Sequence, residues 1–327
     1  MRGTLILSND SGRRVRFSNP LLAAVMASLA CVSPSDAAAR GELRQQAIAV
    51  GDRSREYLLY LPAGHEDRTT RRPLVLVFHG GGGTAKGIAR EVGRSLHTIA
   101  DKEGIYVAYP HAIDKMWDFG AGEVSEALEA RIDDRSFFAA LLDQLTGTLP
   151  VDERRVFATG ISRGGQASYF VACSFPERIR AIAAVAMPMP VFMLELCQDS
   201  TGAPGVVILN GTKDPLVPYD GGQITVGRKQ RGEVMSTDAT IEFWRATNGC
   251  AKQPTQRSVI NTARDRMQVE RTLWDQCEYA PVLLYRIEGG GHTWPSGRQY
   301  LPRFVVGRVN RDIDGASEVW RFFQRFH

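Results

Sequence analysis

The sequence lacks the features by which membrane-spanning and nucleic-acid-binding proteins are recognised. No apolar run approaches the ~20 residues that a helix needs to cross a bilayer. No cluster of Lys and Arg interleaved with aromatic residues offers a surface for nucleic acid. With 43% hydrophobic and 23% charged residues, the chain should instead fold around a sizeable core. We therefore expect neither a nucleic-acid partner nor a stable membrane span.

Patterns that bind metals and nucleotides are also missing. There is no C-x-x-C or H-x-x-x-H spacing, which a zinc site would require. A phosphate-binding loop needs Gly-Lys followed by Ser or Thr, but Lys86 follows Ala85 and precedes Gly87. We expect no metal and no cofactor.

The N-terminus has the features of an export signal. Three arginines precede an apolar stretch over residues 21–32, and small residues at 37–39 offer a cleavage site before Arg40. We expect residues 1–39 to be a signal peptide and residues 40–327 to be one catalytic domain. No linker rich in Pro, Ser or Thr divides that region. The mature protein should then be secreted or periplasmic.

The route of export stays open between the general and the twin-arginine pathways. Arg13-Arg14 fits the second, but Arg16 stands where an apolar residue is usual. Cys31 could carry a lipid, although Ser28-Leu29-Ala30 before it is a poor attachment sequence. Lipid anchoring is the lesser expectation.

Without Cys31, four cysteines remain, an even number in a chain that leaves the cytosol. Three pairings are possible. The sequence-local one joins Cys173 to Cys197 and Cys250 to Cys277, and closes two loops of about 25 residues. We expect this pairing.

Strand and helix patterns alternate along the chain. Apolar runs typical of strands occur at 57–60, 74–78, 105–109, 156–159, 182–185, 206–209 and 282–287. Helical spacing of apolar residues occurs between them, as at Ile88, Val92, Leu96 and Ile99. This alternation predicts an α/β fold with a mostly parallel central sheet and helices on both faces.

Ser162 is the candidate nucleophile. It lies in Gly160-Ile161-Ser162-Arg163-Gly164, a G-x-S-x-G pattern between a predicted strand and a predicted helix. Such a turn holds the serine in a strained backbone conformation with its hydroxyl exposed. An ordinary strand-to-helix turn is the simpler alternative.

A glycine-rich segment, His79 to Gly83, follows the predicted strand 74–78. Such a loop can direct backbone N–H groups into an oxyanion hole. We expect either Gly81 or Gly82 to donate there together with the N–H of Arg163. His79 itself should support the loop rather than carry protons.

His292 is the candidate base, because three glycines precede it in a loop after the predicted strand 282–287. The acid should lie between the nucleophile and the histidine. Asp214 follows the predicted strand 206–209 most closely, and Asp220 is its nearest rival. Asp199 and Asp238 are weaker candidates.

Four motifs together resemble the secreted poly(3-hydroxybutyrate) depolymerase and feruloyl esterase family. They lie at residues 78–82, 160–165, 210–219 and 289–295, and the likeness runs from about Tyr57 to the C-terminus. The resemblance implies an α/β-hydrolase fold and cleavage of carboxylic esters without a cofactor. It also implies a triad of Ser162, Asp214 and His292. Arg163 departs from the small or amide residue expected at its position.

Trp117 and Trp294 are candidate walls of a substrate pocket, with ordinary core packing as the alternative. A soluble aryl, acetyl or other small ester is the expected substrate. Hydroxybutyrate oligomers are the alternative within the family, and peptide cleavage is conceivable on fold analogy. A noncatalytic carbohydrate-binding or scaffold protein on the same fold is the alternative of another class.

Overall fold

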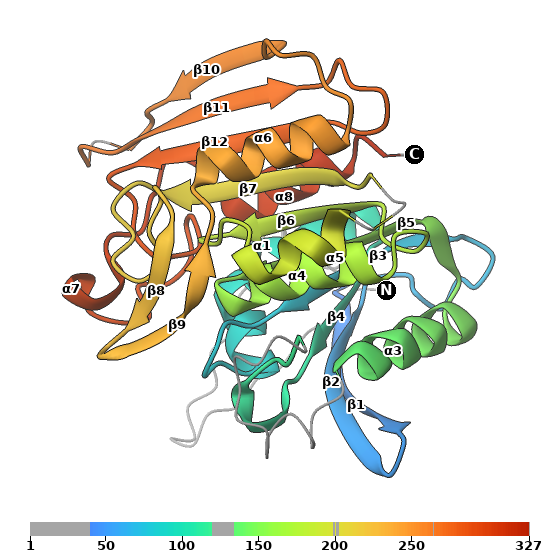
Figure 1. Ribbon diagram of the computed structural model, residues 1–327. Coiled ribbons are helices and arrows are strands. Elements are labelled where there is room, and N and C mark those ends of the chain that lie inside the picture. The colour runs from blue at the N-terminus through green and yellow to red at the C-terminus, as the bar shows by residue number, and fades with distance from the viewer. Residues whose placement is uncertain (1–39, 120–133, 199, 201–202, 264, 327) are drawn as a thin grey trace, which may run out of the picture. The chain divides into compact units, whose positions relative to one another are not determined.

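The computed structural model describes residues 40–119, 134–198, 200, 203–263 and 265–326. The expected signal peptide and Cys31 lie outside these residues. Apolar strands dominate the centre of the described chain and form a ten-stranded sheet, shown in Figure 1. Its spatial order is β1-β2-β4-β3-β5-β6-β7-β12-β11-β10.

In that order, the strands span Glu42–Val50, Arg53–Leu61, Tyr106–Pro110, Arg72–Phe78, Val151–Ile161, Ala181–Val185, Gly205–Gly211, Val282–Glu288, Gln268–Trp274 and Gln256–Ile260. The run from β4 to β12 is parallel, and the strands at both ends pair antiparallel. The predicted parallel sheet is thereby confirmed. A separate hairpin joins β8 (Gly222–Val226) to β9 (Lys229–Val234).

Helices cover both faces of the sheet, as expected. The α-helices are α1 (Ala85–Glu103), α3 (Asp134–Thr148), α4 (Arg163–Ser174), α5 (Leu194–Gln198), α6 (Thr237–Thr247), α7 (Arg303–Val306) and α8 (Gly315–Phe323). Short 3₁₀ turns occur at Ile113–Lys115 and Val191–Met193. Helices α1 and α8 pack into one apolar core, whereas α3, α4 and α6 pack into the other (Figure 1).

Capping residues in the sequence determine where helix α1 begins and ends. Thr84 accepts a hydrogen bond from the Gly87 N–H at its start, and Gly104 ends it in the left-handed conformation at φ 69°. The predicted stripe of Ile88, Val92 and Leu96 is buried against the sheet. Among the described residues, no helix is both long and apolar enough to cross a membrane.

Parallel strands bring their carboxyl ends to one edge of the sheet. The segments that follow β3, β5, β7 and β12 therefore leave from the same edge. These four segments carry the glycine-rich loop, Ser162, Asp214 and His292 respectively.

The two disulfides follow the expected pairing. Cys173 is bonded to Cys197, with Cα atoms 4.9 Å apart, and Cys250 is bonded to Cys277 at 3.8 Å. The first bridge ties the last turn of α4 to α5. The second lies close to where β12 begins.

Candidate active site

Ser162 occupies a sharp turn between β5 and α4. Its φ is 58° and its ψ is −125°, a backbone conformation that non-glycine residues rarely adopt. A Cβ at Gly164 would lie 2.2 Å from the Phe78 carbonyl oxygen, and one at Gly160 would lie 2.4 Å from the Gly164 oxygen. Only glycine fits at these two positions. The two outer glycines of the motif therefore permit the close packing that holds Ser162 in its strained conformation.

His292 and Asp214 form a buried pair. The His292 Nδ1 lies 2.6 Å from Asp214 Oδ2, and their side chains are 4% and 3% exposed. Asp214 Oδ1 accepts hydrogen bonds from the N–H groups of Leu216 and Val217 at 2.8 and 2.9 Å. Because an ionised carboxylate only accepts, Nδ1 donates in this pair, which leaves Nε2 to accept a proton. Asp220, the rival acid, is exposed.

The loops that carry this pair contact each other through backbone. A Cβ at Gly211 would lie 2.3 Å from the Gly290 oxygen, and one at Gly291 would lie 2.3 Å from the Val306 oxygen. The Lys213 N–H also donates to the Gly290 oxygen at 2.9 Å. Gly211 therefore permits close packing between the two loops, and Gly291 permits close packing against the end of α7.

Two residues that follow His292 in the chain hold its backbone by hydrogen bonds. The His292 N–H donates to the Val306 oxygen at 2.6 Å, and the Tyr300 hydroxyl donates to the His292 carbonyl oxygen at 3.0 Å. Nothing in the local sequence around residue 300 predicts this contact. It depends on the segment between His292 and α7, which folds back so that Tyr300 reaches a residue eight positions earlier.

The glycine-rich loop lies against the nucleophile. A Cβ at Gly80 would lie 3.4 Å from the Ser162 Cβ, and one at Gly81 would lie 3.7 Å from the Arg163 Cδ. The Gly82 N–H already donates to the Lys115 carbonyl oxygen at 2.9 Å. This contact disfavours Gly82 as an oxyanion donor. Gly81 is exposed, and no described residue accepts a hydrogen bond from its N–H.

His79 holds this loop, as its sequence context suggests. Its Nδ1 lies 2.8 Å from the Gly80 oxygen, and its Nε2 accepts from the Ala112 N–H at 3.1 Å. Burial lowers the pKa of His79 to about 4, so the ring is neutral at pH 7. A neutral ring with a proton on Nδ1 satisfies both contacts.

Trp117 and Trp294, the two candidate pocket walls, are both buried. The Trp117 side chain has no exposed surface, and its indole N–H donates to the His79 carbonyl oxygen at 2.8 Å. Trp294 is 2% exposed and packs into the core on the α1 and α8 side of the sheet. Core packing, the alternative expected from the sequence, accounts for both rings in this structure, and their role as walls of a substrate pocket stays a prediction.

The Arg163 side chain joins the nucleophile turn to the loop. Its Nε and Nη2 both donate to the Trp117 carbonyl oxygen, at 2.9 and 2.6 Å, and the side chain is largely buried. Trp117 in turn contacts His79. Sequence reasoning singled out Arg163 as a departure from the family pattern, but it did not foresee this contact.

A buried ion pair between Arg55 and Asp134 holds the backbone next to Trp117. Arg55 Nη2 lies 2.5 Å from Asp134 Oδ1, and the Asp118 N–H donates to Asp134 Oδ2 at 2.7 Å. Burial raises the pKa of Asp134 to about 6 despite the nearby guanidinium. Within the described ranges, no group of three or more His, Cys, Asp or Glu side chains is arranged to hold a metal.

Comparison with individual known proteins, rather than with family models, identifies relatives of this chain. No protein-family model matches it. The chain is 30% identical over 280 residues to NocK of Nocardia uniformis subsp. tsuyamanensis, whose name assigns it to the esterases; the match covers 83% of this chain and 79% of NocK. It is 28% identical over 247 residues to feruloyl esterase C of Emericella nidulans, covering 74% and 78%. Feruloyl esterase D of Neurospora crassa is 23% identical, covering 94% and 96%.

Solved structures share the fold at low sequence identity. An acetyl xylan esterase from Aspergillus awamori superposes with a TM-score of 0.56 at 16% identity, covering 87% of this chain and 99% of that one. A dienelactone hydrolase-like promiscuous phosphotriesterase gives 0.54 at 16% identity, covering 88% and 99%. The fold and the order of the site loops define an α/β-hydrolase. Within that class the chain belongs to the esterase family that includes NocK and the feruloyl esterases, and it is a carboxylic-ester hydrolase.

Proposed function

We propose that Ser162, His292 and Asp214 hydrolyse carboxylic esters through an acyl-enzyme. One observation carries this proposal: the 2.6 Å contact between His292 and Asp214 lies at the sheet edge from which Ser162 also projects. The strained turn at Ser162 supports the same assignment, because strain of this kind is typical of a nucleophile elbow.

In the proposed reaction, His292 Nε2 takes the Ser162 hydroxyl proton while Oγ attacks the ester carbonyl carbon. The carbonyl electron pair moves to oxygen, and the N–H groups of Gly81 and Arg163 stabilise that charge. The intermediate collapses, and the departing alcohol takes the proton from His292. Water then attacks the acyl-enzyme by the same steps and releases the acid. Asp214 holds the ring and stabilises its charged form.

The proposed substrates are small aryl or acetyl esters, free or carried on a polysaccharide. Relatives that cover most of the chain are named feruloyl esterases, which supports an aromatic acyl group. Hydroxybutyrate oligomers are the competing substrate within the family. Acyl preference is therefore the property to measure first.

The test compares three variants of the purified protein on methyl ferulate, p-nitrophenyl acetate and a hydroxybutyrate trimer. Ser162→Ala and Asp214→Asn should each lower kcat by about 10³-fold or more, as expected for triad members. Asp220→Asn, an exposed aspartate in the same loop, is the matched control and should change kcat less than about twofold. Retention of a tenth of the activity in Ser162→Ala would remove it as nucleophile. A preference for the trimer would overturn the proposed substrate class.

We further propose that the protein acts outside the cytosol after loss of residues 1–39. The two disulfides support this location, since such bonds persist in oxidising compartments. Protein recovered from the medium or periplasm should begin at Arg40, and mass spectrometry of a nonreduced digest should find all four cysteines paired. An uncleaved chain with free thiols, retained in the cytosol, is the result that contradicts export.

A further inference from the structure

The segment that follows β6 contains a strained residue close to the nucleophile turn. Ala186 has a φ of 50°, in the left-handed region that residues other than glycine rarely adopt. Its side chain is buried. Such a backbone conformation persists only where the surrounding structure imposes it. The neighbours of Ala186 in the chain, Val185 and Met187, make hydrogen bonds that do so on both sides.

On one side, this segment holds the nucleophile turn and the helix after it. The Val185 carbonyl oxygen accepts from the Ser162 N–H at 2.9 Å. The Met187 carbonyl oxygen accepts from the Tyr169 hydroxyl, on α4, at 3.1 Å. A Cβ at Gly165 would lie 2.7 Å from the Met187 Cβ, so the first turn of α4 packs directly on the same residue. A shift of the segment would therefore shift the nucleophile.

On the other side, the segment is held by β7, the strand that leads to the acid's loop. The Ala186 N–H donates to the Leu209 carbonyl oxygen at 2.9 Å, and the Met187 N–H donates to Asn210 Oδ1 at 2.9 Å. Because the Met187 N–H needs an acceptor, the Asn210 amide presents its oxygen there. Its nitrogen donates to Thr237 Oγ1 at 2.9 Å. One amide thus joins the acid's strand, the start of α6 and the strained segment.

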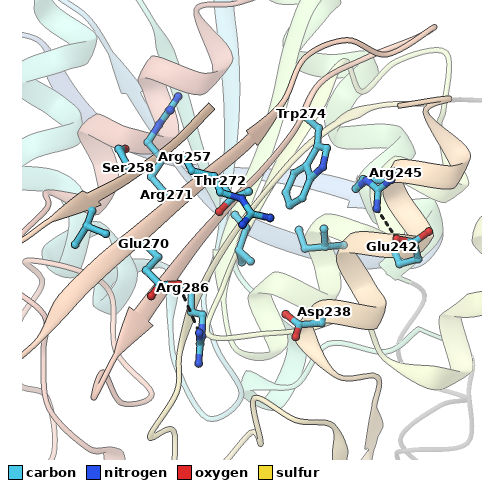
Figure 2. Close-up of a pocket in the computed structure, with 13 residues that line it drawn as sticks. Asp238, Glu242, Arg245, Arg257, Ser258, Glu270, Arg271, Thr272, Trp274 and Arg286 are labelled. Atoms are coloured by element: carbon cyan, nitrogen blue, oxygen red, sulfur yellow. Dashed lines mark hydrogen bonds and ion pairs between the residues drawn. The ribbon is translucent and has the colours of Figure 1, made fainter. Parts of the chain in front are cut away.

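The Asn210 amide is enclosed by protein. Asn210 is 2% exposed, and Thr237 has no exposed surface. Neither residue lines the groove of about 720 Å³ beside α6, whose lining residues are drawn in Figure 2. A side chain with so little open surface has no direct contact to offer a substrate. Any effect of Asn210 on the reaction must therefore pass through the groups that it holds.

We propose that Asn210 is a positioning residue for the nucleophile, acting through residues 185–187. The inference rests on the proposed function, because that function makes Ser162 the nucleophile. Without the Asn210 oxygen, the buried Met187 N–H would lose its acceptor, which is costly enough to displace the segment. A displacement of about 1 Å in a catalytic group can cost up to ~10²-fold in rate. The loss should therefore appear in kcat.

The test compares Asn210→Leu with Asn248→Leu in the purified protein. Leucine is close to asparagine in size and removes the acceptor. Asn248 is the matched control, because it is also buried and its amide donates to the Pro204 and Ala280 carbonyl oxygens, at the opposite end of the strands. At a temperature where circular dichroism shows both variants folded, Asn210→Leu should lower kcat on p-nitrophenyl acetate 10- to 100-fold, with KM changed less than about twofold. Asn248→Leu should stay within about twofold in both constants.

A fluorophosphonate gives a second readout that needs no ester. The Ser162 oxygen attacks the phosphorus and fluoride departs, so the rate of labelling reports how well the nucleophile is placed. In Asn210→Leu this rate constant should fall by about the same factor as kcat. In Asn248→Leu it should match that of the wild type.

A double-mutant cycle tests the route through Met187. Tyr169→Phe removes the hydroxyl that donates to the Met187 carbonyl oxygen and should lower kcat about threefold or more. Combined with Asn210→Leu, it should cost no more than about a further twofold, because both changes release one segment. If Asn210→Leu does not fold, Thr237→Val, which removes the group that orients the amide, takes its place and should lower kcat about threefold or more at unaltered KM.

The other outcomes separate this role from the proposed function. Wild-type kcat in Asn210→Leu or its replacement, or an equal loss in Asn248→Leu, overturns the positioning role. A changed KM alone would put Asn210 in contact with the substrate, and fully multiplicative losses with Tyr169→Phe would exclude the route through Met187. If the wild-type protein neither hydrolyses esters nor reacts with the fluorophosphonate, the proposed function itself fails.

Discussion

Arg163 uses its backbone and its side chain for different tasks. Its N–H lies in the first turn of α4, directly after the nucleophile, where we propose that it faces the oxyanion. Its guanidinium reaches the Trp117 carbonyl, and through Trp117 and His79 it acts on the glycine-rich loop. We therefore regard Arg163 as a positioning residue as well as an oxyanion donor.

Arg163→Met should lower kcat about 10- to 100-fold while KM changes less than about threefold. The reason is that the oxyanion donor of Gly81 loses its support, and removing such a donor outright costs roughly 10²–10³ in kcat. Arg163→Lys keeps one donor within reach of the Trp117 carbonyl and should recover part of the loss. Steady-state kinetics on p-nitrophenyl acetate, at a temperature where circular dichroism shows each variant folded, measures both constants.

A rise in KM at constant kcat would instead mean that the arginine side chain touches the substrate. Equal losses in the Met and Lys variants would mean that packing, and not hydrogen bonding to Trp117, is the property that matters.

At the residue scale, the contact between Asp214 and His292 could be predicted from the sequence because each residue follows a strand with a clear apolar pattern. The oxyanion donor could not be chosen, since the choice depends on the Lys115 carbonyl, which belongs to another segment. The role of Trp117 was missed for the same reason. Its hydrogen bond to His79 joins residues 38 positions apart.

At the scale of elements, α1 docks through a half-buried histidine, His97. The His97 ring stacks on Tyr60 with centroids 3.8 Å apart, and its Nε2 lies 2.8 Å from the Tyr109 hydroxyl. Burial lowers the pKa of His97 to about 4, well below its ordinary value of about 6.5. The packed helix therefore requires the neutral ring.

His97 should make the stability of the protein depend on pH. Its pKa in the folded state is below the unfolded value, so its stabilising contribution is complete above about pH 6.5 and is lost as the pH falls toward 4. The loss should be on the order of 2–3 kcal/mol. Urea unfolding at pH 7, 5.5 and 4 should show a shallower decline for His97→Gln than for the wild type. Parallel declines would mean that His97 is protonated in the folded protein.

The central strands and the helices α1 and α3 could be predicted because burial on one or both faces imposes a regular apolar pattern. The outer strands β1 and β10 could not. Most of their side chains are exposed, and β1 reads Glu-Leu-Arg-Gln-Gln at its start. Backbone pairing with β2 and β11 defines them instead. The sequence-based prediction therefore included part of β2, from the run 57–60, but neither of the outer strands.

At the scale of the whole molecule, the sheet order brings distant segments together. Strand β5 lies between β3 and β6, and β7 lies beside β12, although many residues separate them in the chain. The two disulfides lie toward the other edge of the sheet. Cys173, in the last turn of α4, comes eleven residues after Ser162, and Cys250–Cys277 lies close to where β12 begins. The disulfides and the loops that carry the candidate catalytic residues thus lie at opposite ends of the strands.

The contact between the His292 and Asp214 loops has a consequence for how the protein acquires activity. It joins residues 78 positions apart and needs β7 and β12 already paired. Closing such a long loop is slow compared with forming a local helix. A refolding chain would regain its helical circular dichroism before it regained turnover, so the appearance of esterase activity marks the completion of the sheet.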